Sequence, residues 1–213
     1  MDIYGHCPSL ENERYRIRFA AEQDWEDLLK VYSDAAAVPL FNSDNCHGDD
    51  FHYTTPERMM QAIRFWIWSY DQGYFVRWSI VDRRENHVVG TVELFRRVSE
   101  DSYNGCAVLR LDLRSDHERE DDLTDLLRLI VPRVYAWFDC DRIVTKAVPA
   151  ASDRIQALRK AGFVPEDAPL IGHDGTQYGD YWTRSVDLEA DRRNWARNAL
   201  PPAARRKMVS HLY

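Results

Sequence analysis

The spacing of apolar residues changes several times along the chain, and each change predicts a new element. Residues 15–19 alternate briefly between apolar and polar side chains, which predicts a short strand. Apolar residues recur at helical spacing through 23–33, and again after Thr55 and Pro56, which suit an N-cap and a first helical turn. Between these two helices, residues 34–53 follow no period and predict a polar loop.

The middle of the chain changes to the two-residue period of strands. Residues 74–82 and 87–95 predict a hairpin, and residues 107–114 predict a third strand with leucines on one face and charged residues on the other. The helical pattern returns through 123–134 and predicts a long helix. Pro132 lies inside that pattern, so we expect it to kink or interrupt the helix.

The remaining elements are short. Residues 143–148 predict a strand, residues 153–161 a helix stopped by Gly162, and residues 170–171 and 178–186 two strands that finish the sheet. The full order, β-α-α-β-β-β-α-β-α-β-β, predicts the α/β (α+β) class. We expect a mixed, mostly antiparallel central sheet covered by helices on both faces.

Charge narrows the choice of partners. The 213 residues carry a formal net charge of -7, which argues against general binding of nucleic acid or of an anionic membrane. Basic residues concentrate in residues 188–213. We therefore assign residues 1–187 to one domain, with a core at 14–187, and residues 188–213 to a basic C-terminal extension.

The cysteines and the apolar runs indicate a compartment. The four cysteines are widely separated and form no CxxC pair, which suits a reducing environment and no zinc site. The N-terminus lacks a basic start followed by an apolar run, and no apolar stretch is long enough to cross a bilayer. We expect a cytoplasmic protein.

Three stretches carry a resemblance to a known family. Residues 75–95, FVRWSIVDRRENHVVGTVELF, resemble the central hairpin of the GNAT acetyltransferases. Residues 141–163, which end in LRKAGF, resemble the strand, short helix and Gly-Phe of that family's second motif. Residues 179–182, GDYW, are similar to the last strand of the branch that acetylates ribosomal-protein N-termini and small amines. The resemblance covers roughly residues 14–187.

The resemblance implies acetyl transfer from acetyl-CoA to a primary amine, on a small molecule or a peptide N-terminus, without a metal. Acetyl-CoA would lie along the third central strand and on the turn that follows it. The residues assigned to it are Leu111, Leu113, Arg114, Ser115, Arg119 and Arg154. The aromatic residues assigned to the acceptor are Phe41, Phe51, Tyr53 and Tyr181, although strand packing is an alternative role for Tyr181. A homodimer is compatible with the resemblance.

The chain departs from the family's pattern in the turn that would hold the pyrophosphate. Residues 114–122 read RSDHEREDD and contain no glycine, whose missing side chain would let the backbone approach the phosphates. Their carboxylates suit the first turn of a helix, where the helix dipole favours negative charge. They also lie in the positive potential that a phosphate group would use. Leu158 stands where the family has a tyrosine that returns a proton to the thiolate, and Ala151 where it has an asparagine.

These departures leave two alternatives beside acetyl transfer. One is a protein of this fold that binds or regulates without transferring an acyl group, and the other is transfer from a different acyl donor. The candidate general base is Glu93 or Asp112, which share a face with Arg110 if the strands pair antiparallel. Arg77 can join this cluster, and the alternative is a charge-paired patch across the strands.

The polar loop contains residues that can bind metals. Cys46, His47, Asp49, Asp50 and His52 follow no established ligand spacing. We therefore interpret this stretch as a solvated loop at the border of the acceptor pocket.

Overall fold

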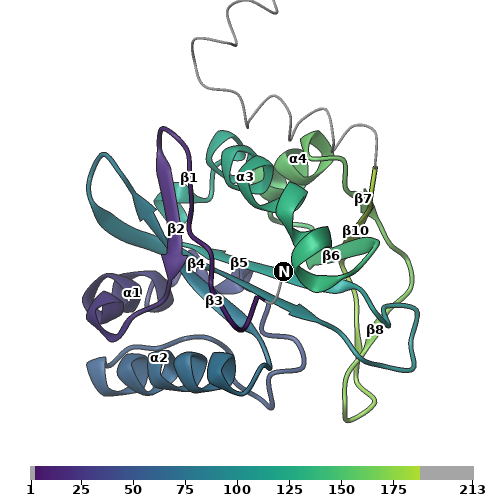
Figure 1. The fold of residues 1–213 in the computed structure, drawn as a ribbon, viewed down its shortest axis with the longest axis horizontal. Coiled ribbons are helices and arrows are strands. Elements are labelled where there is room, and N and C mark those ends of the chain that lie inside the picture. Colours follow the sequence, from purple (N-terminus) through teal and green to yellow (C-terminus); the bar gives the residue numbers. More distant parts are fainter. Residues whose placement is uncertain (1–2, 188–213) are drawn as a thin grey trace, which may run out of the picture.

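The predicted hairpin lies at the centre of an eight-stranded sheet. The computed structural model describes residues 3–187, and Figure 1 shows helices on both faces of the sheet. The strand order is β1-β2-β3-β4-β5-β6-β10-β7. The strands of this sheet are β1 (Leu10–Glu11), β2 (Tyr15–Phe19), β3 (Val76–Asp82), β4 (His87–Arg96), β5 (Ala107–Leu113), β6 (Arg142–Lys146), β7 (Val164–Pro165) and β10 (Tyr181–Ser185).

The helices lie in the order that the apolar periods predict. They are α1 (Trp25–Tyr32), α2 (Pro56–Asp71), α3 (Glu120–Phe138) and α4 (Ser152–Lys160), with short 3₁₀ turns η1 (Glu22–Asp24), η2 (Val38–Leu40) and η3 (Ser115–His117). Thr55 caps α2 as expected, because its side chain accepts a hydrogen bond from the Arg58 backbone N–H at 3.3 Å. Gly162 follows α4 with a φ of +84°, which confirms it as the residue that ends this helix.

Each face of the sheet packs against its own pair of helices. In Figure 1, α1 and α2 lie on one side of the sheet and α3 and α4 on the other. Leu109, Leu111 and Leu113 of β5 point toward α3 and belong to the larger apolar core. Because side chains alternate along a strand, Arg110 and Asp112 point the opposite way, toward α1 and α2. The fold class predicted from the sequence is confirmed.

The only parallel pairing recorded in this sheet, among residues 3–187, joins β5 to β6. It holds at Ala107↔Ile143 and Val108↔Val144, although β5 continues to Leu113 and β6 to Lys146. The two strands therefore part as they run toward their C-terminal ends. In a strand, alternate backbone N–H groups point to each neighbour, so those of β5 that point away from β4 face this opening.

Three expectations need correction. Helix α3 runs without interruption through Pro132, because a single lost N–H bond is outweighed by the apolar face that the helix buries. The strand at 170–171 does not join the main sheet, since β8 (Leu170–Ile171) pairs with β9 (Gln177–Tyr178) in a separate hairpin. The short edge strands β1 and β7 were not predicted, because two residues carry no period. Within residues 3–187, no helix has the length and apolarity needed to cross a membrane.

Candidate functional site

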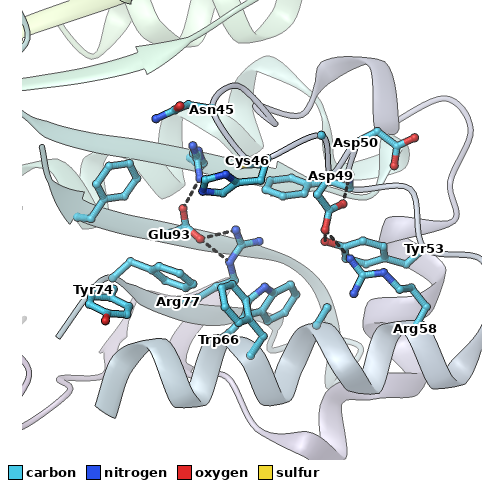
Figure 2. Close-up of a pocket in the computed structure, with 18 residues that line it drawn as sticks. Asn45, Cys46, Asp49, Asp50, Tyr53, Arg58, Trp66, Tyr74, Arg77 and Glu93 are labelled. Atoms are coloured by element: carbon cyan, nitrogen blue, oxygen red, sulfur yellow. Dashed lines mark hydrogen bonds and ion pairs between the residues drawn. The ribbon is translucent and has the colours of Figure 1, made fainter. Parts of the chain in front are cut away.

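An open cleft of about 960 Å³ lies on the face of the sheet that carries α1 and α2. Figure 2 shows its two walls, with the loop that contains Asn45, Cys46 and Asp49 on one side and helix α2 with Trp66 on the other. Charged side chains from β3, β4 and β5 form part of its lining. The aromatic residues that line it are Phe51, Tyr53, Phe65, Trp66, Tyr74, Phe75 and Phe95.

The charged part of the lining is a row across three neighbouring strands. Arg77 pairs with Glu93 in register, and Glu93 pairs with Arg110, so all three side chains lie on one face. The Glu93 carboxylate accepts hydrogen bonds from Arg77 Nη2 at 2.5 Å and from Arg110 Nη1 at 2.7 Å. Arg77 also stacks over the Trp66 ring, 4.4 Å from its centroid. The antiparallel pairing thus brings together the cluster that the sequence predicted.

This pairing decides the protonation state of Glu93. Burial by itself would raise the pKa of its carboxyl, but the charges of Arg77 and Arg110 outweigh burial and lower the pKa below the usual value for a glutamate. Glu93 is therefore an anion with a low affinity for protons. This suits a group that accepts a hydrogen bond from the neutral acceptor amine better than one that removes its proton.

Asp112 lies on the same face, two residues after Arg110, but it is not among the residues that line the cleft. Its Oδ2 accepts hydrogen bonds from the Tyr32 hydroxyl at 2.9 Å and from Arg77 Nη1 at 3.3 Å. Its Oδ1 is buried without a hydrogen-bond partner. Burial raises the pKa of Asp112, so it has the higher proton affinity of the two candidate bases but lies deeper.

A second polar group, which the sequence did not reveal, lies where β5 and β6 part. Lys146 Nζ donates to both carboxylate oxygens of Asp44, at 2.8 and 2.7 Å. The Tyr181 hydroxyl donates to Asp44 Oδ2 at 3.2 Å, and Arg110 Nη2 donates to the Asp44 backbone carbonyl at 2.8 Å. Asp44 thereby joins the 34–53 loop to β5, β6 and β10. The available signal was Lys146, the charged residue within the strand predicted at 143–148.

The predicted acceptor residues separate into two groups. Phe51 and Tyr53 line the cleft, as expected for residues that shape an acceptor pocket. Phe41 packs in the core against Tyr32, with ring centroids 5.4 Å apart, and Tyr181 lies under Asp44; neither lines the cleft. Both are held by packing that the sequence could not show.

The polar loop forms one wall of the cleft. Asp49 is held there by the Tyr53 hydroxyl at 3.0 Å and by Arg58 Nη2 at 2.5 Å. Across residues 3–187, no three side chains of the kinds that bind metals gather in a ligand set.

Each of the three arginines assigned to acetyl-CoA forms an ion pair at residues 114–122, between β5 and the first turn of α3. Arg114 pairs with Asp116 at 2.7 and 2.8 Å, and Arg119 pairs with Asp122 at 3.1 Å. Arg154 of α4 reaches the turn and holds Glu118 through two bonds of 2.6 and 2.8 Å. The three arginines predicted to bind phosphate are therefore all paired with carboxylates of the turn itself.

The Arg154–Glu118 pair is the most enclosed of the three. The Arg154 and Glu118 side chains are 4% and 7% exposed, whereas Asp116 is 59% exposed. Asp122 is also buried and is shared between Arg14 and Arg119. Of the other residues assigned to acetyl-CoA, Ser115 donates its backbone N–H to Asp34 at 2.9 Å, and Leu111 and Leu113 lie in the core. Carboxylates of the turn thus pair both with its own arginines and with Arg14, Arg154 and Lys160 from other elements, unlike a glycine-rich turn that offers free backbone N–H groups to an anion.

Comparison with known proteins identifies the architecture. The sequence matches no protein-family model and no curated protein. The structure is similar to the ribosomal-protein-S5-alanine acetyltransferase from Vibrio fischeri, with a TM-score of 0.63, 17% identity, and coverage of 85% of this chain and 98% of that one. It is also similar to a GNAT-family acetyltransferase from Bacillus anthracis, with a TM-score of 0.62, 13% identity, and coverage of 84% and 98%.

A third similar structure contains a ligand. The RimL ribosomal L7/L12 alpha-N-protein acetyltransferase, solved in complex with coenzyme A, has a TM-score of 0.60 and 15% identity, and the match covers 84% of this chain and 99% of that one. Identities this low establish the fold alone. The resemblance inferred from the hairpin and the C-terminal motifs is confirmed at that level: residues 3–187 have the fold of the GNAT acetyltransferases.

Proposed function

We propose that this protein is an N-acetyltransferase that transfers the acetyl group of acetyl-CoA to a primary amine bound in the cleft. The observation that carries the proposal is the parting of β5 and β6 after Val108 and Val144, directly beside the charged row. The opening offers backbone N–H groups of β5 to an extended acyl carrier. The cleft meets the opening at Arg110, so an acceptor and an acyl group can approach each other there.

In the proposed reaction, the carboxylates of the site and the backbone of β5 have separate roles. Glu93, kept anionic by its two arginines, orients the acceptor amine through a charge-assisted hydrogen bond. The amine nitrogen attacks the thioester carbonyl carbon, and backbone N–H groups of β5 stabilise the developing oxyanion. Asp112, whose pKa is raised by burial, is the stronger proton acceptor, but it does not line the cleft and its Oδ2 is held by the Tyr32 hydroxyl.

The acceptor is proposed to be a peptide N-terminus. Two of the similar structures are named as ribosomal-protein acetyltransferases, which supports a peptide or protein acceptor here. The cleft is open and has aromatic walls, so it suits an extended chain that enters by its end. A small amine is the other acceptor class, but it would fill a smaller part of the cleft.

The fit to acetyl-CoA differs between the two ends of that molecule. The opening between β5 and β6 suits the pantetheine arm. Leu111 and Leu113 would contact this arm through their backbone, because their side chains pack in the larger core. The pyrophosphate end meets arginines that already hold Asp116, Glu118 and Asp122. Phosphate binding therefore requires an exchange of partners, and we expect weak binding.

The paired turn favours a second candidate function. A protein of this fold that binds peptides without transferring an acyl group would have no need of free arginines at this turn. The two functions are separated by incubating the protein with acetyl-CoA and a mixture of peptides with free N-termini, and by measuring acetylation by mass spectrometry. Acetylated peptides support the transferase, and binding of peptides without acetylation supports the second function.

Three further assignments stay predictions. They are the cytoplasmic location, the homodimer, and the division into a domain at 1–187 and a basic extension at 188–213. The whole extension lies outside the described residues. Fractionation, sedimentation and limited proteolysis, respectively, test them.

A further inference from the structure

Lys146 lies at the edge of the opening between β5 and β6. Counted from the last pair, Val108↔Val144, Arg110 and Lys146 each lie two residues farther along their strands. Lys146 also pairs in register with Tyr181 of β10, which places both on the face that carries Arg110 and the cleft. The ammonium group and the Arg110 guanidinium therefore flank the opening from its two sides.

Asp44 fixes the ammonium group in this place. Its carboxylate accepts both bonds from Lys146, while its backbone carbonyl accepts the bond from Arg110, so one loop residue spans the opening. The Lys146 and Asp44 side chains are 17% and 11% exposed, so the pair is largely shielded but still reaches solvent or a ligand. The Lys146 ammonium group has three N–H donors, of which two are directed at the Asp44 carboxylate, so one is left for a ligand in the opening.

In the proposed acetyl transfer, the thiolate that leaves an acyl donor bound in the opening between β5 and β6 needs a proton. When the carbon–sulfur bond breaks, the thiolate that leaves is stabilised by a proton donor. Leu158 of α4 is 2% exposed, packs in the larger core and has no proton to donate. Burial and Asp44 raise the pKa of Tyr181, which makes its hydroxyl a poorer donor, and this hydroxyl already donates to Asp44.

We propose that Lys146 is the general acid that protonates the leaving thiolate. This inference rests on the proposed acetyl transfer. As the bond from the acceptor nitrogen to the carbonyl carbon forms and the carbon–sulfur bond breaks, one proton passes from Nζ to sulfur. The neutral Nζ then takes up the proton that the acceptor nitrogen releases, so one proton moves in net from the amine to the thiol. Asp44 orients the Lys146 side chain through its two hydrogen bonds.

Two substitutions distinguish proton donation from a structural role. Lys146→Arg keeps the positive charge and can keep the ion pair with Asp44, but a guanidinium does not give up its proton. Lys146→Gln keeps a hydrogen bond without the charge. We expect both variants to lose about 10²–10⁴-fold in kcat with acetyl-CoA, the usual worth of a positioned acid, with little change in KM. Lys30→Gln is the matched control, because Lys30 is a lysine paired with an aspartate on α1, is 58% exposed and does not line the cleft; it should retain most of the activity.

The leaving group supplies the decisive readout. Acetyl-CoA is compared with S-phenyl thioacetate, whose aromatic thiolate leaves without help from an acid. The loss in the Lys146 variants should shrink to less than about tenfold with the phenyl thioester, because the protonation step is no longer needed. An equal loss with both donors, or full activity of Lys146→Arg, would overturn the assignment while leaving acetyl transfer intact. A wild-type protein that neither binds acetyl-CoA nor turns it over would overturn the proposed function and this inference together.

Discussion

The buried pair between Arg154 and Glu118 gives the sharpest prediction about the turn. Glu118→Gln removes the charge that balances Arg154, whose side chain is 4% exposed. Removing one partner of a buried ion pair typically costs about 3–5 kcal/mol, because the other charge is left uncompensated. For a chain of this size, 1 kcal/mol corresponds to roughly 2–4 °C in Tm. We therefore expect Tm to fall by about 6–20 °C.

The same substitution should improve the binding of acetyl-CoA. In the variant, Arg154 has no carboxylate partner, so a pyrophosphate can neutralise it without displacing Glu118. A gain of about 1.4 kcal/mol would tighten Kd tenfold. Acetyl-CoA should then raise the Tm of Glu118→Gln more than that of the wild type, since a ligand at 100 times its Kd adds about 2.7 kcal/mol.

Differential scanning fluorimetry with and without acetyl-CoA measures both effects. Asp116→Asn is the matched control, because Asp116 belongs to the same turn and pairs with Arg114 but is 59% exposed. An exposed ion pair contributes about 0–1 kcal/mol, so this variant should stay close to the wild type. If Glu118→Gln behaves like Asp116→Asn, or if acetyl-CoA protects it no better than the wild type, the reasoning about the turn is wrong.

Three other substitutions test separate parts of the account. Gly90→Ala should destabilise the fold by about 1–3 kcal/mol in urea unfolding, because a Cβ would lie 2.3 Å from the Asp112 carbonyl; an unchanged midpoint would contradict this packing. Asp101→Asn should destabilise at pH 7 and become neutral in acid. The pKa of Asp101 is lowered by Arg97 and its other hydrogen-bond donors against the effect of burial, so its contribution is present above the unfolded pKa of about 3.9 and is lost as pH falls toward the folded value. A loss of stability that does not depend on pH would refute the electrostatic explanation. Glu93→Gln should lower kcat by about 10²-fold, because the acceptor amine loses the carboxylate that orients it. Asp112→Asn tests the alternative in which Asp112 rather than Lys146 takes the proton of the amine, and a loss of about 10²-fold or more would favour that alternative. Folded variants with full activity would leave both as structural ion pairs.

The sequence predicted the elements whose periods and caps are local. The hairpin of β3 and β4 followed from alternation, and α2 followed from Thr55, Pro56 and an apolar face. The pairing of segments that are distant in the sequence could not be predicted from such local patterns. The hairpin of β8 and β9 stands apart from the main sheet because it packs beside Tyr103 and Tyr181, and no local pattern shows this.

In the candidate site, too, the contacts between adjacent strands could be predicted from the sequence, whereas the contacts made by the loop could not. Arg77, Glu93 and Arg110 share a face by simple alternation on adjacent strands, so their cluster followed from the sequence. Asp44 and Lys146 meet only because the loop folds over the opening. The backbone of that loop has positive φ at Asn45, His47 and Phe51, a conformation that few non-glycine residues adopt and that composition does not reveal.

The acidic turn was predicted as a sequence feature, but its internal pairing was not. Its carboxylates were expected either to cap a helix dipole or to oppose phosphate. In the structure Asp122 is buried between Arg14 and Arg119, and Glu118 is buried against Arg154. These contacts depend on where β2 and α4 lie relative to the turn, which the order of the residues does not contain.

Calorimetric titration of the 213-residue chain with acetyl-CoA measures whether the acyl donor binds. We expect saturable binding of one acetyl-CoA per chain, weaker than that of a protein of this fold with a glycine-rich turn and tighter in Glu118→Gln. The absence of saturable heat from both the wild type and Glu118→Gln, with both proteins folded, would contradict acetyl transfer from acetyl-CoA.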